Sequence, residues 1–371
     1  MGINGQFDIR GVARKFDIFG EFRSAEPYGS GHINDTFRAT YYQGGTTLHY
    51  LHQRINHNIF QNPEALMDNI IRVTRHIRTK LNGLKGSSRR SLTLVPTLDG
   101  EVCLRDDEGN FWRTYVFIEG ARTYDAVQTK QQAFEAARAF GLFQKQLVDL
   151  PGPRLHDTIP KFHHTPSRFR ALQEAIEADE SNRAQHAKPE IEFAMAHADM
   201  VSRLVELQER GEIPERVTHN DTKFNNVMID DETGEGICVV DLDTVMPGLA
   251  LYDFGDMVRT TTSPTREDEQ DLSKVGMDFE MYEALLRGYL ETAGEFLNDR
   301  EKQELAFSGK LITFEIGVRF LTDYLRGDTY FKVHREGHNL DRCRTQFKLV
   351  ESIESNEDRM NTLLERVEVG A

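Results

Sequence analysis

The sequence contains few cysteines and no long apolar run, and both absences restrict the class of protein. Its three cysteines, Cys103, Cys238 and Cys343, are odd in number and far apart in the chain. This arrangement is typical of reduced thiols in a cytoplasmic protein, not of a disulfide framework or a zinc site. No apolar stretch reaches the length that spans a bilayer, and the opening residues MGINGQFDIR carry charges where a signal peptide has its apolar core. We therefore expect a cytoplasmic protein without a membrane partner.

Basic residues are also in short supply. The chain has 45 Lys and Arg residues against 60 Asp and Glu residues, a formal net charge of −15 at pH 7. Nucleic-acid binding depends on Lys and Arg side chains that displace counterions from phosphates, so this balance argues against a nucleic-acid partner. The acidic charge balance does not argue against a small-molecule substrate. With 371 residues, the chain is long enough for two domains that each have a core.

What the sequence does contain is one stretch, from Arg216 to Asp243, that combines acidic, amide and basic residues with a hairpin pattern. It reads RVTHNDTKFNNVMIDDETGEGICVVDLD, in which two short β-favouring runs flank the turn-forming residues DETG. This pattern predicts a hairpin whose two ends lie together. Asn226 stands near the start of the hairpin and Asp241 at its end, and Asp221 comes shortly before it.

These residue types suit phosphoryl transfer, which needs an aligned acceptor hydroxyl, a proton acceptor and magnesium held against the phosphates. Asp221 would be the proton acceptor, and Lys223 would reach the γ-phosphate. Mg²⁺ keeps several waters and takes one or two protein oxygens, so the amide oxygen of Asn226 and a carboxylate oxygen of Asp241 would suffice. Taken singly, each residue belongs to an ordinary turn-forming pattern. Together they form the ordered pattern H-x-D-x-K-x-x-N before a β-run that ends in Asp, which predicts a catalytic loop.

The pattern resembles the catalytic and metal loops of the protein-kinase-like superfamily. Within that superfamily, HNDTKFNN, VVDLDTVMPG and LYDFGD are similar to the aminoglycoside phosphotransferase branch, and most of all to the N-acetylhexosamine 1-kinases. The resemblance covers almost the whole chain and is weakest in residues 82–110 and 160–190. It implies a bilobal α+β fold, with a small β-rich N-lobe at 1–120, a hinge, and a larger, mainly helical C-lobe at 121–371.

Two neighbouring acidic patterns leave alternatives open. In an extended strand Asp243 shares a face with Asp241, so Asp243 is either a further metal ligand or only a brace for the loop. The triplet Asp253-Phe254-Gly255 matches a kinase metal motif by its letters, but it lies 32 residues after Asp221 and follows a Pro-Gly turn instead of a strand. We expect Asp253 and Asp256 to cap a helix or to hold the catalytic loop, and we assign them no chemical role.

A glycine-containing loop interrupts two β-rich runs near the N-terminus. Gly29, Ser30 and Gly31 lie within YGSGHINDTF, and their backbone amides would cover the phosphates of ATP. By pattern alone a plain hairpin is the favoured interpretation. The resemblance to the phosphate-covering loop of the N-acetylhexosamine kinases favours the ATP role instead. Asn34 and Asp35, in the same segment, would serve sugar hydroxyls or phosphate-bound water.

Two later strands would complete the nucleotide site. The alternating run from Thr47 to Ile55 is expected to be the N-lobe strand with a basic residue, which would be Arg54 where protein kinases have lysine. A solvated arginine on an edge strand fits the pattern equally well. The run FWRTYVFIEG resembles the hinge strand of kinases, whose backbone would bind adenine at Phe117, Ile118 and Glu119.

Helical periodicity dominates the second half of the chain. Helices are predicted over 63–81, 131–150, 278–296 and 298–326, with two more within 167–210. In the 298–326 segment Glu315, Arg319 and Asp323 recur every four residues, which by spacing alone predicts an ion-pair ladder along one helix face. The resemblance implies a different role, in which Arg319 and Tyr330 contact a sugar.

Together, motifs and resemblance predict a kinase that uses ATP and Mg²⁺ to phosphorylate the anomeric hydroxyl of N-acetylglucosamine or N-acetylgalactosamine. Asp221 would contact the sugar, orienting its hydroxyl and taking the proton, while Lys223 and Arg54 would offset phosphate charge. A kinase of another small alcohol, of aminoglycoside, choline or homoserine type, would use the same machinery. A catalytically inactive kinase-like binding protein is the other alternative, although it would be expected to lack Asp221, Asn226 or Asp241. A protein kinase is disfavoured because no Gly follows Asp241-Leu242 and no Ala-Pro-Glu triplet is present. We expect a monomer.

Overall fold

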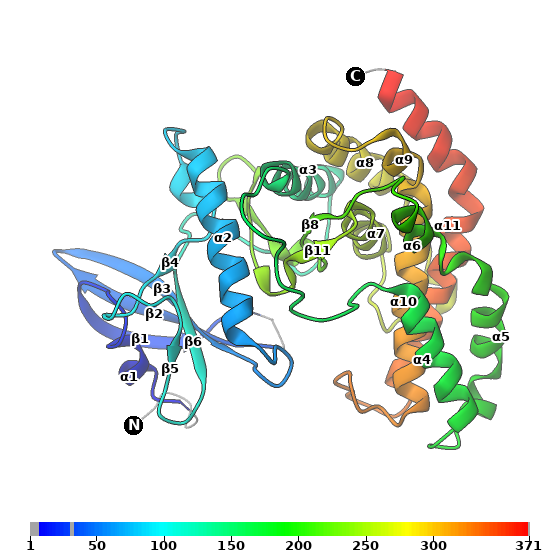
Figure 1. The fold of residues 1–371 in the computed structure, drawn as a ribbon, viewed down its shortest axis with the longest axis horizontal. Helices are drawn as coiled ribbons and strands as arrows, with labels where there is room; N and C mark the ends of the chain where they lie inside the picture. The colour runs from blue at the N-terminus through cyan, green and yellow to red at the C-terminus, as the bar shows by residue number, and fades with distance from the viewer. Residues whose placement is uncertain (1–6, 30–32, 370–371) are drawn as a thin grey trace. The chain divides into compact units, whose positions relative to one another are not determined.

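The computed structural model describes residues 7–29 and 33–369, and the chain divides into two compact units (Figure 1). We name them the sheet unit, made of Met1–Asp125, Asp149–Ile159 and Met228–Met246, and the helical unit, made of Ala126–Val148, Pro160–Val227 and Pro247–Ala371. The expected boundary after residue 120 lies near the first crossing. Two segments expected in the C-lobe, 149–159 and 228–246, nevertheless belong to the sheet unit. Asn69 of the sheet unit binds both segments, because its Nδ2 donates hydrogen bonds to the carbonyls of His156 (2.8 Å) and Val245 (3.0 Å).

The sheet unit is built on an antiparallel sheet. Within the described residues its strand order is β1-β2-β3-β6-β4, and β5 also pairs with β6. The strands are β1 (Glu21–Pro27), β2 (Asp35–Gln43), β3 (Thr46–Ile55), β4 (Leu94–Val95), β5 (Leu104–Arg105) and β6 (Phe111–Val116). The helix α2 (Pro63–Leu81) has the bounds that its periodicity predicts, since Asn62 caps its first turn and Pro63 starts it.

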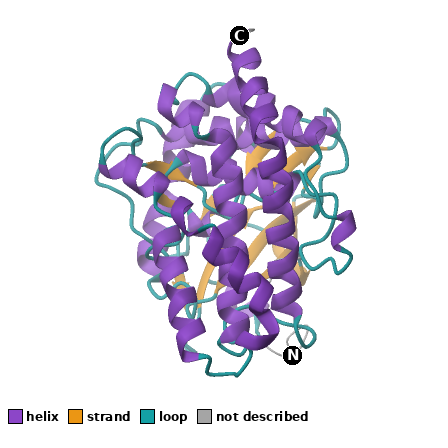
Figure 2. Ribbon diagram, turned by 90° about the vertical axis from the view of Figure 1, so that its right-hand side faces the viewer, coloured by secondary structure: helices purple, strands orange, loops and turns teal. Residues whose placement is uncertain are grey.

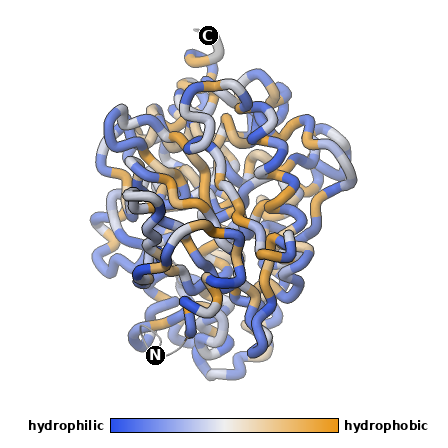
Figure 3. The backbone as a smooth tube through the Cα atoms, turned by 90° about the vertical axis from the view of Figure 1, so that its left-hand side faces the viewer, coloured by the Kyte–Doolittle hydropathy of each residue, from blue (hydrophilic) through white to orange (hydrophobic). Residues whose placement is uncertain are grey.

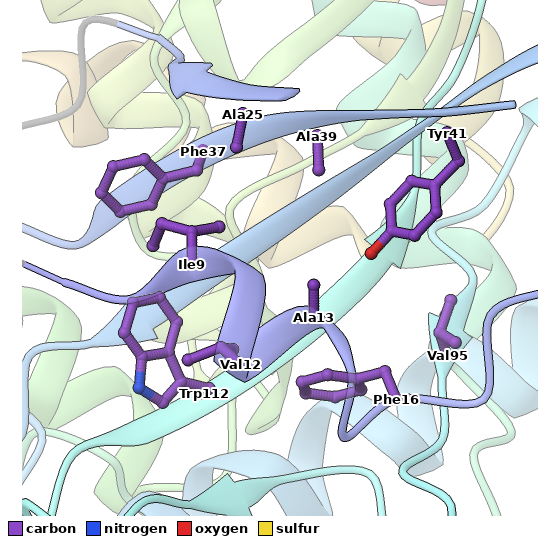
Figure 4. Close-up of a cluster of buried hydrophobic side chains, with 10 residues drawn as sticks. All are labelled: Ile9, Val12, Ala13, Phe16, Ala25, Phe37, Ala39, Tyr41, Val95 and Trp112. Atoms are coloured by element: carbon purple, nitrogen blue, oxygen red, sulfur yellow. The ribbon is translucent and has the colours of Figure 1, made fainter. Parts of the chain in front are cut away.

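One face of this sheet is covered by the short helix α1 (Ile9–Ala13). Figure 4 shows Ile9 and Val12 of α1 directed toward Phe37 and Trp112 of the sheet. Trp112 is fully buried, and its indole N–H donates a hydrogen bond to Asp106 Oδ2 at 2.8 Å. In Figure 3 apolar and hydrophilic stretches alternate along the chain, as expected where one side of each strand is buried.

A second, smaller sheet of the order β10-β9-β7 contains the hairpin that the DETG pattern predicts. Its strands are β7 (Ala121–Arg122), β9 (Val227–Asp230) and β10 (Gly236–Val239). At the turn, the Asp230 carboxylate accepts hydrogen bonds from the backbone N–H groups of Glu232 (3.0 Å) and Thr233 (2.9 Å). A further strand, β8 (Arg216–Thr218), pairs with β11 (Met246–Gly248).

The helical unit consists largely of α-helices (Figure 2). They are α3 (Lys130–Leu147), α4 (Thr165–Ala178), α5 (Lys188–Ala196), α6 (Arg203–Glu209), α7 (Ala250–Thr261), α8 (Phe279–Ala293), α9 (Asp299–Gln303), α10 (Leu305–Leu325) and α11 (His338–Val369). The single helix predicted over 298–326 is two helices, α9 and α10, that meet at the buried Glu304. The carboxylate of Glu304 binds Arg203 and Arg300. None of the helices formed by the described residues has the length and apolarity of a membrane-spanning segment.

The helix α10 forms the centre of this unit and packs against α4, α7 and α11. Glycines bring α7 and α10 close together. A Cβ atom at Gly255 of α7 would lie 2.4 Å from the carbonyl oxygen of Ser308, and one at Gly309 of α10 would lie 2.8 Å from Val258 Cγ1. Gly255 therefore serves helix packing, which explains the Asp-Phe-Gly triplet without a metal site.

Candidate active site

The segment before Asp221 is held by a buried carboxylate of α7. Asp253 Oδ2 accepts a hydrogen bond from His219 N (2.9 Å), and Asp253 Oδ1 accepts one from Asn220 N (2.7 Å). The carbonyl of Asp253 also accepts a hydrogen bond from the hydroxyl of Thr222 at 2.6 Å. The expectation that Asp253 holds the catalytic loop is thus confirmed.

Three of the predicted catalytic residues lie together in the helical unit. Lys223 Nζ is 2.8 Å from Asp221 Oδ1. Asn226, in a 3₁₀ turn at Phe224–Asn226, donates hydrogen bonds from Nδ2 to the backbone carbonyl of Asp221 (2.8 Å) and to its Oδ2 (3.2 Å). Burial alone would raise the pKa of Asp221, but the Lys223 ammonium outweighs it and holds this pKa below its ordinary value. Asp221 is therefore an ionised carboxylate that can accept a proton.

The amide of Asn226 is oriented for a metal ligand. Because its N–H₂ group is used by Asp221, its carbonyl oxygen Oδ1 is left as the ligand atom. In the sheet unit Asp241 lies two residues after the end of β10, is exposed, and has a left-handed backbone with φ 57°. An amide oxygen and a carboxylate oxygen are the donor types that Mg²⁺ takes. No group of three or more His, Cys, Asp or Glu side chains within the described residues forms a metal cluster, so water and phosphate would have to supply the remaining ligands.

Asp243 has the contacts of a brace. Its Oδ1 is 2.5 Å from Arg113 Nη1, and its Oδ2 accepts a hydrogen bond from Asn34 Nδ2 at 2.6 Å. Its backbone carbonyl accepts a hydrogen bond from the hydroxyl of Thr158 at 3.0 Å. Both carboxylate oxygens are occupied, so of the two roles left open by the sequence these contacts favour bracing.

Arg113 is the residue that sequence reasoning missed. It lies on β6, is 1% exposed, and its Nε (2.8 Å) and Nη2 (2.6 Å) donate to Gln53 Oε1 of β3. Burial would lower the pKa of Arg113, but the Asp243 carboxylate raises it above the ordinary value, so the guanidinium stays charged. The signal was an arginine inside the aromatic run FWRTYVF, because a charge in a buried strand requires a partner.

Arg54 lies on the other face of the same sheet. Its Nε donates to Asp35 Oδ2 at 2.8 Å, and its guanidinium carbon lies 4.8 Å from the ring centre of Phe7. Its cross-strand neighbour Trp112 belongs to the core beneath α1. Side chains alternate along a strand, so Arg54 faces away from Arg113. These two side chains bind one another on the α1 face, which favours a structural role over the expected phosphate clamp at Arg54 and sugar contact at Asp35.

The structure describes only part of the predicted phosphate-covering loop, and it describes all of the predicted hinge residues. Gly29 follows β1 with φ 85°, a conformation suited to glycine, whereas Ser30 and Gly31 lie outside the described residues. In the hinge, Phe117 N–H donates to the carbonyl of His49 (3.2 Å), and Arg89 Nε donates to the carbonyl of Glu119 (2.9 Å).

Between these two bonds, the N–H and C=O of Ile118 form no hydrogen bond with any described residue. One free donor and one free acceptor on adjacent backbone are what the edge of an adenine ring requires. The residues present thus fit the predicted nucleotide contact. The side chain of Glu119 does not contribute to this pair of groups, since its Oε1 is bound to His49 Nδ1 at 2.6 Å.

The predicted ion-pair ladder on α10 is wrong. Glu315 accepts hydrogen bonds from other elements, among them the hydroxyl of Thr165 at 2.6 Å. Asp323 accepts hydrogen bonds from the backbone N–H groups of residues 329–331 and from Asn339 Nδ2. The reason is burial: Glu315 is 0% exposed and Asp323 is 4% exposed, so both bind across helices instead of along a solvated face.

The side chain of Arg319 lies against aromatic rings, while the Glu315 carboxylate is within its electrostatic reach but is bound by His163 and Thr165 instead. Its guanidinium carbon lies 5.1 Å from the ring centre of Phe162 and 5.7 Å from that of Phe331. No carboxylate among the described residues forms an ion pair with it. Tyr330 is 64% exposed, and its ring lies edge-on to Phe331 with 4.8 Å between the ring centres. The structure thus places Arg319 and Tyr330 around the same ring, Phe331.

Comparisons with known proteins give the same fold. A family model described as "Phosphotransferase enzyme family" matches residues 24–300. An aminoglycoside phosphotransferase from Alicyclobacillus acidocaldarius is similar with a TM-score of 0.62 and 12% identity, over 98% of each chain. A choline kinase from Cryptosporidium parvum has a TM-score of 0.54 and 16% identity, over 96% of this chain and 98% of that one. A GDP complex of aminoglycoside 2′-phosphotransferase-IIIa has a TM-score of 0.50 and 14% identity, over 95% and 99%. The predicted fold, a β-rich N-terminal region with a helical C-terminal region, is confirmed.

Proposed function

We propose that this chain, which belongs to the phosphotransferase enzyme family, transfers the γ-phosphoryl group of ATP to the anomeric hydroxyl of N-acetylglucosamine or N-acetylgalactosamine. The observation that carries the reaction type is the loop of the helical unit, where an ionised Asp221 is bound by Lys223 and Asn226. Phosphoryl transfer depends on such positioning and on charge stabilisation more than on covalent chemistry.

Each residue then has a defined task. Asp221 orients the acceptor hydroxyl and takes its proton, while the Lys223 ammonium offsets charge on the transferred phosphoryl group. Asn226 and Asp241 would hold Mg²⁺, whose charge would offset the negative charge of the phosphates when bound. Ile118 would bind the base of the nucleotide. The hydrogen-bond donor and acceptor on the edge of guanine are exchanged relative to those of adenine. One fold neighbour forms a GDP complex, so activity with ATP should be compared with activity with GTP.

The charge near Arg319 supports a neutral acceptor. Burial lowers the pKa of Arg168 and the nearby Arg319 lowers it further, so two guanidiniums lie within electrostatic reach of one another. Neither forms an ion pair with a carboxylate among the described residues. A choline or aminoglycoside cation would meet like charge here, whereas sugar hydroxyl and acetamide oxygens accept hydrogen bonds from guanidinium groups. The exposed ring of Tyr330 offers a face for a sugar ring.

A kinase of a cationic alcohol is the second candidate, and the fold likeness to a choline kinase favours it. An acceptor panel separates the two. Release of ADP should be measured with ATP and Mg²⁺ against N-acetylglucosamine, N-acetylgalactosamine, glucose, galactose, choline, ethanolamine and an aminoglycoside. We expect turnover with an N-acetylhexosamine and little with the cations. Turnover confined to the amino alcohols or aminoglycosides would overturn the proposed acceptor, and no turnover with any acceptor would support an inactive binding protein.

A further inference from the structure

The backbone of Asn220 is held by two side chains. Asp253 binds its N–H, and a buried histidine, His163, binds its C=O. His163 Nε2 is 3.0 Å from the carbonyl oxygen of Asn220, and His163 Nδ1 is 2.8 Å from Glu315 Oε1. The side chains of His163 and Glu315 are 3% and 0% exposed. Asn220, the residue directly before Asp221, therefore has the carboxyl group of Asp253 on its N–H and an imidazole on its C=O.

The partners fix the protons of this imidazole. A carbonyl oxygen can only accept a hydrogen bond, so Nε2 of His163 must carry a hydrogen. Glu315 accepts a hydrogen bond from the Thr165 hydroxyl on Oε2, at 2.6 Å, and the guanidiniums of Arg319 and Arg168 lie within its electrostatic reach, which together favour the ionised carboxylate. Its Oε1 then requires a hydrogen on His163 Nδ1. With both ring nitrogens donating, His163 is an imidazolium.

The electrostatic surroundings agree with that assignment. Burial would lower the pKa of His163, but the Glu315 carboxylate outweighs it and raises this pKa above the ordinary value. Burial would raise the pKa of Glu315, but the imidazolium holds it below the ordinary value. Arg319 of α10 acts against the charge on His163, and Arg168 of α4 is a second cation near Glu315. Tyr252 of α7, whose ring centre is 5.5 Å from that of His163, stays neutral because burial raises its pKa.

We propose that His163, as an imidazolium paired with Glu315, is a positioning residue that sets the backbone of Asn220 and thereby the direction of the Asp221 carboxylate. The inference rests on the proposed role of Asp221 as proton acceptor. Asn220 has φ 64°, in the left-handed region that non-glycine residues rarely adopt. Its N–H is fixed by Asp253 and its C=O by His163, so the peptide that leads into Asp221 cannot rotate without breaking a charge-assisted hydrogen bond.

A positioning role predicts a specific kinetic pattern. His163→Leu removes both hydrogen bonds and should lower kcat by about tenfold, the size expected for a lost hydrogen bond to a charged group. The KM for ATP should stay within about twofold, since the loss affects orientation at the acceptor more than nucleotide binding. His163→Gln keeps an N–H donor for the Asn220 carbonyl and should restore part of kcat. His186→Gln, at an exposed histidine of the same unit, is the matched control and should behave as wild type.

The pH dependence tests the charge separately from the shape. A raised pKa means that the contribution of His163 is complete below its ordinary pKa of about 6.5 and is lost as pH rises through the higher folded value. Glu315→Gln removes the anion but keeps a hydrogen-bonding partner. The alkaline decline of kcat that His163 causes in wild type should therefore move to lower pH in Glu315→Gln and be missing in His163→Gln. An alkaline limb that is unchanged in both variants contradicts the proposal.

The protonation state of His163 can also be measured without any acceptor, by ¹⁵N NMR of the histidine rings in the full chain. The His163 signal, assigned as the one missing in His163→Gln, should show both nitrogens still protonated just above pH 6.5, where an ordinary imidazole has lost more than half of its charge. A neutral ring at that pH overturns the inference whatever the activity of the variants. Asp221→Asn separates the proton-acceptor role of Asp221 from the positioning role of His163. Retained turnover in that variant contradicts the proton-acceptor role. If Asp221→Asn loses turnover and His163→Leu keeps the wild-type kcat, only the positioning role of His163 is contradicted.

Discussion

The proposed catalytic loop (Asn220 to Asn226) of the helical unit and the proposed metal loop (Asp241 to Asp243) of the sheet unit share a backbone feature. Each contains a non-glycine residue in the left-handed region: Asn220, with φ 64°, directly precedes Asp221, and Asp241 itself has φ 57°. Such residues cost roughly 1–2 kcal/mol and persist only when their surroundings hold them. Each loop is therefore expected to have a support built into its own unit.

The supports differ in kind. The catalytic loop is held through its backbone, by the side chains of Asp253 and His163 on other elements. The metal loop has a backbone hydrogen bond, from the Thr158 hydroxyl to the Asp243 carbonyl, but its charged support acts on a side chain of its own, because Arg113 pairs with Asp243. Losing a backbone support should mainly misdirect a carboxylate and change the rate. Losing the partner of a buried side-chain charge should mainly change stability.

The largest expected effect is on stability, from Arg113→Met. This variant leaves the buried Asp243 carboxylate without its cation, and breaking such a pair costs about 3–5 kcal/mol. The free energy of unfolding should fall by that amount in urea titrations. The double variant Arg113→Met/Asp243→Leu removes both charges and should recover much of the loss. Equal destabilisation in the single and double variants would contradict the assignment of Asp243 as a braced anion.

Next comes Asp221→Asn, which keeps the shape of the side chain but removes the proton acceptor. We expect kcat to fall by about 10²-fold or more while the midpoint of thermal unfolding changes little. This variant can be compared directly with Arg113→Met. Asp221→Asn should lower kcat without lowering the free energy of unfolding, whereas Arg113→Met should mainly lower the free energy of unfolding. Wild-type turnover in Asp221→Asn would refute the role of Asp221.

A smaller effect is expected from Asp241→Asn, which exchanges a charged oxygen ligand for a neutral one. The concentration of Mg²⁺ that gives half-maximal activity should rise by about tenfold, because a carboxylate binds this hard cation more strongly than an amide. A magnesium titration of activity in wild type and variant provides the measurement. If the requirement is unchanged, Asp243 becomes the better candidate for the ligand.

The smallest effect is expected from Arg54→Met, the same substitution as at Arg113 but on the opposite sheet face. The pair of Arg54 with Asp35 is partly exposed, so its loss should cost about 0–1 kcal/mol of stability. The KM for ATP should not change, since this face is covered by α1. A rise in that KM would reinstate Arg54 as a phosphate ligand.

Much of this architecture could be predicted because the signals are local. The bounds of α2 follow from periodicity, the Asn62 cap and Pro63, and the β9–β10 hairpin follows from a turn whose acidic residue binds its own backbone. The grouping of Asp221, Lys223 and Asn226 also follows from short spacing. In each case, residues within a few positions determine one another's placement.

The errors concern contacts made over long distances in the sequence. Spacing cannot tell which face of β3 is covered by α1, so it assigns Arg54 to the phosphates and misses Arg113, whose partner Asp243 is 130 residues away. The four-residue spacing of Glu315, Arg319 and Asp323 predicts a surface pattern, because charged residues give no sign that α10 is buried. Glu315 is bound by His163, 152 residues earlier in the chain.

The central claim is that Asp221 drives transfer of phosphate to the anomeric oxygen of a neutral N-acetylhexosamine. It is tested most directly by ³¹P NMR of the products formed from ATP, Mg²⁺ and N-acetylglucosamine or N-acetylgalactosamine. The account predicts a sugar phosphate whose phosphorus couples to the proton on C1, formed by wild type and missing with Asp221→Asn. A phosphorus coupled to another ring position, or an equal yield of product from both proteins, would contradict it.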